Sequence, residues 1–225
     1  MKRNSLYVAA LALAAFTTTT VVTGCKSSGY QMADKTGAGI AEFRAEIVNG
    51  KKAVDSTMAA LDQIAVQANT DPRPAFEKFS KELDNLESVA AKARKRAEDM
   101  KASGQAYFKQ WEEQLSQVKD EDIRQLAQER KQKLQETFDK IREYTEPLKE
   151  QFDPWMSSLK DLRSYLANDL TVSGVAAAKK PFAKAKSEGV KVQKSMDDLV
   201  EELNDLAATL TASKVAPSAG SAPAK

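Results

Sequence analysis

Residues 76–118 read FEKFSKELDNLESVAAKARKRAEDMKASGQAYFKQWEEQLSQV and contain the most regular pattern in this chain. Apolar or small side chains recur every seven residues in one series, and a second series interleaves with it. The two series are Phe76, Leu83, Ala90, Ala97, Gly104, Trp111 and Val118, and Phe79, Leu86, Ala93, Met100 and Tyr107. A sustained heptad repeat buries one seam of a long helix against other helices. The pattern therefore predicts a coiled-coil-like helical bundle.

Three other segments, residues 34–68, 123–170 and 172–210, show apolar side chains in steps of three and four. At 1.5 Å per residue, the four helices would each be roughly 55 to 75 Å long. Short turns separate them, and Asp120 is placed to cap the third helix. Together these features predict an all-α, elongated up-down-up-down antiparallel four-helix bundle. An open chain of helices, or a hairpin completed by a second subunit, is the alternative, which leaves a homo-oligomer open.

The third helical segment contains two prolines, Pro147 and Pro154, and should kink or divide there. Its seam includes Ile123, Leu126 and Arg130 near its start. Counting through the preceding turn places Arg130 beside Trp111, where a guanidinium could stack on the indole.

A size-matched layer is expected in the middle of the bundle. Phe152 and Pro147 would face small residues at the same depth on the other three helices, because dense packing requires large side chains to oppose small ones. Those small residues are Gly50, Ala90 with Ala93, and Gly189.

Composition removes several classes of function. The chain has no histidine and a single cysteine, so zinc sites of the usual kinds, imidazole catalysis and internal disulfides are excluded. No cofactor and no metal site is expected. Lys2 and Arg3 account for the excess of 34 basic over 32 acidic residues. Without them the side-chain charge is zero, which gives no electrostatic support for binding nucleic acid.

The start of the chain has the features of a secretory signal peptide. Lys2 and Arg3 precede an apolar run, and small residues lead to Cys25 in the sequence Val22-Thr23-Gly24-Cys25. A retained transmembrane anchor would need about 20 mostly apolar residues, and the run here is shorter and contains four consecutive threonines. We therefore expect residues 1–24 to be a signal peptide, 25–32 a lipidated spacer, 33–213 the helical domain and 214–225 a disordered tail.

This signal resembles that of bacterial lipoproteins. The resemblance implies that Cys25 is the lipid-attachment residue, carrying diacylglyceryl on sulfur and a fatty acid such as palmitate on its amine. Lys26 follows the cysteine where retained lipoproteins often have aspartate. The expected location is therefore the bacterial cell envelope, at the outer membrane and facing the periplasm.

Two basic clusters and several carboxylate pairs are the remaining candidate sites. The clusters are Lys92, Arg94, Lys95, Arg96 and Lys101, and Lys179, Lys180, Lys184, Lys186, Lys191 and Lys194. They could bind an anion, a phospholipid headgroup or an acidic partner, but Glu143, Glu146 and Glu150 should lie at a similar depth and compensate them. Adjacent carboxylates such as Glu112 with Glu113, or Glu201 with Glu202, point apart on a helix and should be solvated.

Three short motifs resemble one family. Residues 107–115 read YFKQWEEQL, Glu146-Pro147-Leu148 precedes Phe152, and Asn168-Asp169-Leu170 precedes the last helix. Over most of residues 30–212 the chain is similar to an uncharacterised bacterial family of long helical lipoproteins, known only as domain of unknown function 2959. The resemblance implies the helical fold and supplies no active-site residues.

No catalytic residue emerges, so an enzyme is not expected. The sequence favours a lipid-anchored envelope protein that acts as a helical scaffold, spacer or protein-interaction module with an unidentified envelope partner. The alternative is a binder of membrane lipid or cell-wall polymer.

Overall fold

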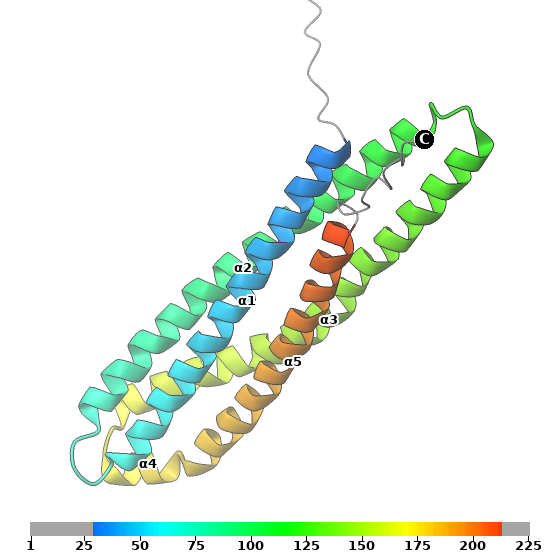
Figure 1. The fold of residues 1–225 in the computed structure, drawn as a ribbon. Coiled ribbons are helices and arrows are strands. Elements are labelled where there is room, and N and C mark those ends of the chain that lie inside the picture. Colours follow the sequence, from blue (N-terminus) through cyan, green and yellow to red (C-terminus); the bar gives the residue numbers. More distant parts are fainter. Residues whose placement is uncertain (1–28, 213–225) are drawn as a thin grey trace, which may run out of the picture.

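The computed structural model describes residues 29–212, which form an elongated all-α bundle (Figure 1). Its helices are α1 (Gly29–Val66), α2 (Arg73–Leu115), α3 (Glu121–Asn168), α4 (Val172–Ala177) and α5 (Lys179–Ala212). No strand occurs between residues 29 and 212. The all-α prediction is confirmed.

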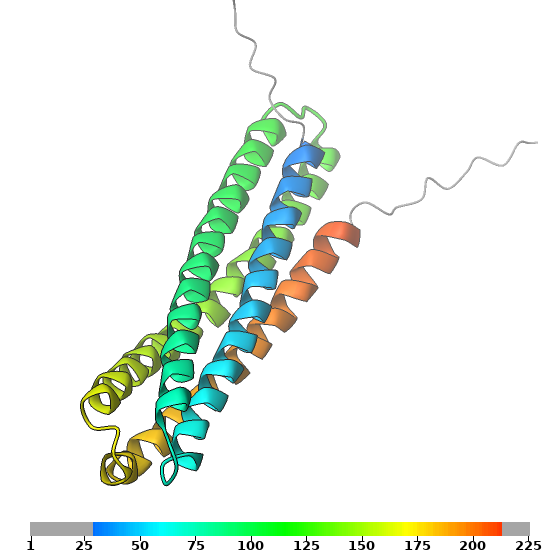
Figure 2. The same cartoon turned by 90° about the vertical axis from the view of Figure 1, so that its left-hand side faces the viewer.

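The four long helices pack as antiparallel neighbours in chain order (Figures 1 and 2). α1 packs against α2 and α5, while α3 packs extensively against α5 and more sparsely against α2. The beginning of α1, the α2–α3 connection and the end of α5 lie at one end, which we call the proximal end. The α1–α2 connection and α4 lie at the other, distal end.

The heptad seam of α2 faces the core as predicted. Its members are buried at Phe79, Leu83, Leu86, Met100, Gly104 and Tyr107, and half-buried at Phe76, Ala90, Ala93, Ala97, Trp111 and Val118. The largest fully buried side chains come from all four long helices and include Ile40, Leu61, Ile64, Phe79, Leu83, Trp155, Leu159, Leu166, Leu199 and Leu203.

The helix boundaries differ from the expectations at the start of α1 and within the last helix. α1 begins at Gly29, so four residues of the expected spacer 25–32 are helical, and the first helix starts five residues before the predicted segment 34–68. Met32 and Ala33 pack against the core, and this contact extends the helix towards the N-terminus. Pro72 is the N-cap residue of α2, which begins at Arg73.

At α3 the capping prediction is correct, because the Asp120 carboxylate accepts a 3.1 Å hydrogen bond from the Ile123 amide. The expectation of one continuous last helix is wrong. The chain forms α4 and α5 with a break at Ala178. Pro181 has no N–H to donate to the carbonyl of Ala177, so the ladder of hydrogen bonds is interrupted there.

α3 itself continues through Pro147 and Pro154 without dividing, and a kink at these residues stays a prediction. The first turns of its seam are not covered, since Ile123 is 56% exposed, Leu126 is 68% exposed and Arg130 is also exposed. Placing these three residues in the buried seam was wrong. Their exposure shows that no helix covers this stripe, in keeping with the sparse packing of α3 against α2 as a whole.

The middle of the bundle contains two size-matched levels and not one. Phe152 is 6% exposed, as expected, whereas Pro147, which was expected in the same layer, is exposed. A Cβ added to Gly50 would lie 3.4 Å from Met196 Cε, whereas one added to Gly189 would meet Met58 and would lie 3.1 Å from Trp155 Cζ2. Gly189 and Met196 are separated by about 10 Å along α5. Each glycine therefore receives a methionine of the neighbouring helix, and Trp155 occupies the space that was assigned to Phe152.

Replacing Phe152 with alanine should lower the free energy of unfolding by about 3–5 kcal/mol, because a buried ring would be lost and a cavity left. Chemical denaturation measures the change. Leu126→Ala is the matched control and should cost less than about 0.5 kcal/mol, since its side chain is exposed. Equal losses in the two variants would contradict the register described above.

Gly189→Leu should destabilise the bundle by about 1–3 kcal/mol, because the new side chain would overlap Met58 and Trp155. Gly37→Leu is the control, since an added Cβ there has no atom within 4 Å. Removing that helical glycine should be neutral or stabilise by up to about 1 kcal/mol. Thermal unfolding of both variants tests the prediction, and an unchanged midpoint for Gly189→Leu would refute the close α1–α5 packing.

Candidate functional site

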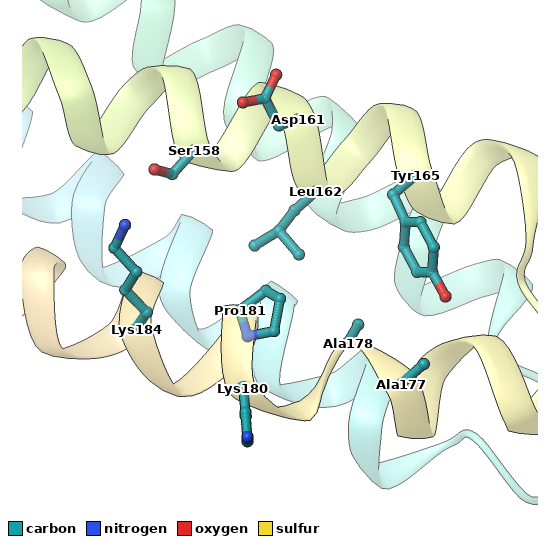
Figure 3. Close-up of a pocket in the computed structure, with 9 residues that line it drawn as sticks. All are labelled: Ser158, Asp161, Leu162, Tyr165, Ala177, Ala178, Lys180, Pro181 and Lys184. Atoms are coloured by element: carbon teal, nitrogen blue, oxygen red, sulfur yellow. The ribbon is translucent and has the colours of Figure 1, made fainter.

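An open groove of about 700 Å³ lies between α3 and the α4–α5 segment near the distal end (Figure 3). It is lined by Ser158, Asp161, Leu162, Tyr165, Ala177, Ala178, Lys180, Pro181 and Lys184. The volume falls within the range of pockets that hold small ligands or side chains of partners.

The break between α4 and α5 forms one wall of this groove. Thr171 caps α4 by accepting a 3.1 Å hydrogen bond from the Gly174 amide, and Tyr165 of α3 donates a 3.1 Å bond to the Gly174 carbonyl. A side chain at position 174 would collide with Asp169, so the turn needs a glycine there. These contacts fix α4 against the end of α3.

The groove combines an apolar floor with a cation at one end. Leu162 and Pro181 face each other across it, and Lys184 and Ser158 point towards each other from opposite helices (Figure 3). Asp161 directs its carboxylate away from α5, and Lys180 points away from α3. The chemistry suits an apolar group that carries a negative charge at one end.

Sequence reasoning did not find this groove. Only Lys180 and Lys184 among its lining residues were candidates, as members of the second basic cluster. Pro181 within an otherwise regular helical repeat was the available signal, because a proline so close to a helix start marks a local change in the backbone.

The first basic cluster is compensated in part, but not by the expected glutamates. Arg94 pairs with Asp153 and lies over the Phe152 ring at 5.8 Å, and Arg96 pairs with Glu42 at 2.7 Å. Glu146 instead approaches Arg142 of its own helix at 4.0 Å. Most of these side chains are exposed, so each pair contributes about 0–1 kcal/mol.

The second cluster is less compensated. Lys186 pairs with Asp62 at 2.8 Å, and Lys184 approaches Glu188 at 3.7 Å on its own helix. We call Lys184, Lys191 and Lys194 the lysine row, because residues spaced by seven and ten positions share one helix face. Lys191 and Lys194 make no ion pair with any residue in 29–212.

The paired carboxylates behave as surface groups. Glu112 binds Lys131 of α3, while Glu201 is exposed and Glu202 is half-buried. Within residues 29–212, no group of three or more potential ligands is arranged to hold a metal ion. No helix in this range is both long and apolar enough to cross a membrane. Cys25 lies outside the described residues, as do the predicted signal peptide and tail.

An aromatic cluster lies between α2 and α3 nearer the proximal end. The ring centroid of Tyr107 is 5.4 Å from that of Phe108 and 5.4 Å from that of Trp111. The ring centroid of Phe138 in α3 is 5.8 Å from that of Phe108. Burial raises the pKa of Tyr107 above its ordinary value, and the positive charge of Arg130 opposes this to a smaller extent. The predicted stacking of Arg130 on Trp111 stays a prediction.

The raised pKa of Tyr107 predicts a loss of stability at alkaline pH. Above about pH 10 the unfolded chain releases the tyrosine proton while the folded chain retains it, so the free energy of unfolding falls as pH rises. Denaturation from pH 8 to pH 11 should show a smaller fall for Tyr107→Phe than for the wild type. Tyr30→Phe should match the wild type, since Tyr30 is 71% exposed. If the free energy of unfolding falls equally with pH in all three proteins, the loss of stability does not come from Tyr107.

Comparison with known proteins gives one match. Residues 26–210 match the family described as "Protein of unknown function (DUF2959)". No curated protein and no solved structure matches this chain.

Proposed function

The chain belongs to the DUF2959 family, and we propose that it is a lipid-anchored protein of the bacterial cell envelope whose bundle serves as a spacer and protein-interaction module. The family description assigns no activity, so the proposal depends on the arrangement of this molecule. It assigns no catalytic residue and no cofactor.

The separation of the two ends is the observation that carries the proposal. Only three residues stand between Cys25 and Gly29 in the sequence, so a lipid on Cys25 would be within about 14 Å of the proximal end of α1. The groove lies at the other end of helices that span about 55 to 70 Å. A bundle anchored in this way would present its groove well away from the membrane.

The outer membrane, with the bundle in the periplasm, is the proposed location. The runner-up is binding of cell-wall polymer or membrane lipid. Lys191 and Lys194, which make no ion pair with any residue in 29–212, favour it because such ligands are often anionic. Purification from membranes separates the two functions. A stoichiometric protein partner supports the interaction module, whereas selective retention by peptidoglycan or by liposomes supports the runner-up.

Lipid attachment at Cys25 is directly testable. Cells fed radioactive palmitate should label the wild-type chain and not Cys25→Ser, and the variant should leave the membrane fraction. Thr23→Ser changes a neighbouring residue without removing the thiol and serves as the control. Equal labelling of the wild type and Cys25→Ser would exclude the proposed anchor.

A further inference from the structure

We propose that the groove and the lysine row together form a docking site for an acidic amphipathic segment of a partner protein. This inference rests on the proposed interaction function and specifies the chemistry of the partner. Lys184 belongs to both features, so the lysine row starts at the groove and continues along α5. The ten residues from Lys184 to Lys194 cover about 15 Å of helix.

The placement of charge on α5 is unfavourable for the helix alone. Lysines at positions 179 and 180 occupy its first turn, which contains no acidic residue, and its last turn contains no basic residue. Cations near a helix N-terminus oppose the helix dipole, at a cost of typically 0.3–1 kcal/mol each at the surface. This cost concerns Lys179 and Lys180, which lie outside the lysine row. The case for an acidic partner therefore rests on Lys191 and Lys194, which make no ion pair with any residue in 29–212.

The groove supplies the apolar part of the site. Leu162, Pro181 and Ala178 form a concave floor that can receive one or two apolar side chains, and Lys184 stands at its edge. A helical or extended partner segment could place an apolar side chain in the groove and its neighbouring acidic residues along the lysine row. Apolar anchors in pockets with charged residues around them are the usual arrangement of binding hot spots.

A second copy of this chain fits the surface less well. Beyond Lys194 the same face of α5 becomes acidic, with Asp198, Glu202 and Asp205. Two copies could therefore match charges through this face only in antiparallel orientation, which puts their proximal ends at opposite ends of the pair. Copies anchored in one membrane would be parallel and would place like charges together.

The anchoring membrane is also an unsuitable ligand for this site. Groove residues 177–184 lie about 40 to 50 Å along α5 from its end at the proximal side. Phospholipid headgroups of a membrane that holds Cys25 would not reach them. A partner protein that approaches the distal end would.

The test measures binding of a defined peptide to the full chain purified in detergent. The probe is a fluorescent peptide of four Glu-Glu-Leu-Leu repeats, followed by fluorescence anisotropy. The double variant Lys184→Glu with Lys191→Glu should weaken binding about ten-fold or more. Its control, Lys78→Glu with Lys81→Glu on α2, reverses two exposed lysines with the same change in net charge and should bind as the wild type does.

A second variant tests the groove without changing charge. Ala177→Trp fills the groove from an exposed helical position and should also weaken binding about ten-fold or more. Circular dichroism and thermal unfolding establish that each variant is folded. Binding that weakens with the charge reversal and not with Ala177→Trp would overturn the assignment of the groove.

Other outcomes also contradict the inference. These are equal affinity for a Lys-Lys-Leu-Leu peptide, stronger binding to phosphatidylglycerol vesicles or to peptidoglycan than to the acidic peptide, and dimers of the chain that the Lys184→Glu and Lys191→Glu changes dissociate. Palmitate labelling and membrane fractionation report separately on the proposed function. If the chain binds the peptide but takes up no palmitate in cells, the anchor alone is refuted. If the chain takes up palmitate but does not bind the peptide, the docking site alone is refuted.

Discussion

Trp155 ties α3 to α5, and the distal half of the bundle depends on that contact. Its indole is fully buried and donates a 2.7 Å hydrogen bond to the carbonyl of Ala185. An indole N–H left without a partner in the core would cost about 1–3 kcal/mol. The ring can approach α5 this closely because Gly189 has no side chain. Position 189 thus sets the distance between the two helices that border the groove.

The two ends of the bundle differ in how completely they are packed. At the distal end α3 is fixed to α5 by Trp155 and to α2 by Lys160 with Glu87 and Arg163 with Asp84, both at 2.6 Å. Towards the proximal end Phe138 and Lys131 of α3 still contact Phe108 and Glu112 of α2, but the first turns of α3 expose Ile123 and Leu126. The helices that border the groove are therefore held together by a buried hydrogen bond.

The groove lies at the break between α4 and α5, next to the turn that leads from α3 into α4. Pro181 removes a hydrogen bond between α4 and α5, and Gly174 permits the close turn against Asp169. The same interruption leaves lysines in the first turn of α5, where helix stability disfavours them. One interruption of the backbone therefore lies beside both the groove and the lysine-rich start of α5.

The sequence alone determined the all-α fold, the seam of α2 and the Asp120 cap, because helical periodicity and capping depend on residues within a few positions of one another. Its lack of histidine and of paired cysteines also excluded whole classes of chemistry. Only the tertiary structure decided that Ile123 and Leu126 are uncovered, that Gly50 and Gly189 each oppose a methionine, and that Arg94 pairs with Asp153. These features depend on the relative axes and depths of separate helices. A repeat of three and four residues specifies which face of a helix is apolar, but not how far along that face a neighbouring helix extends.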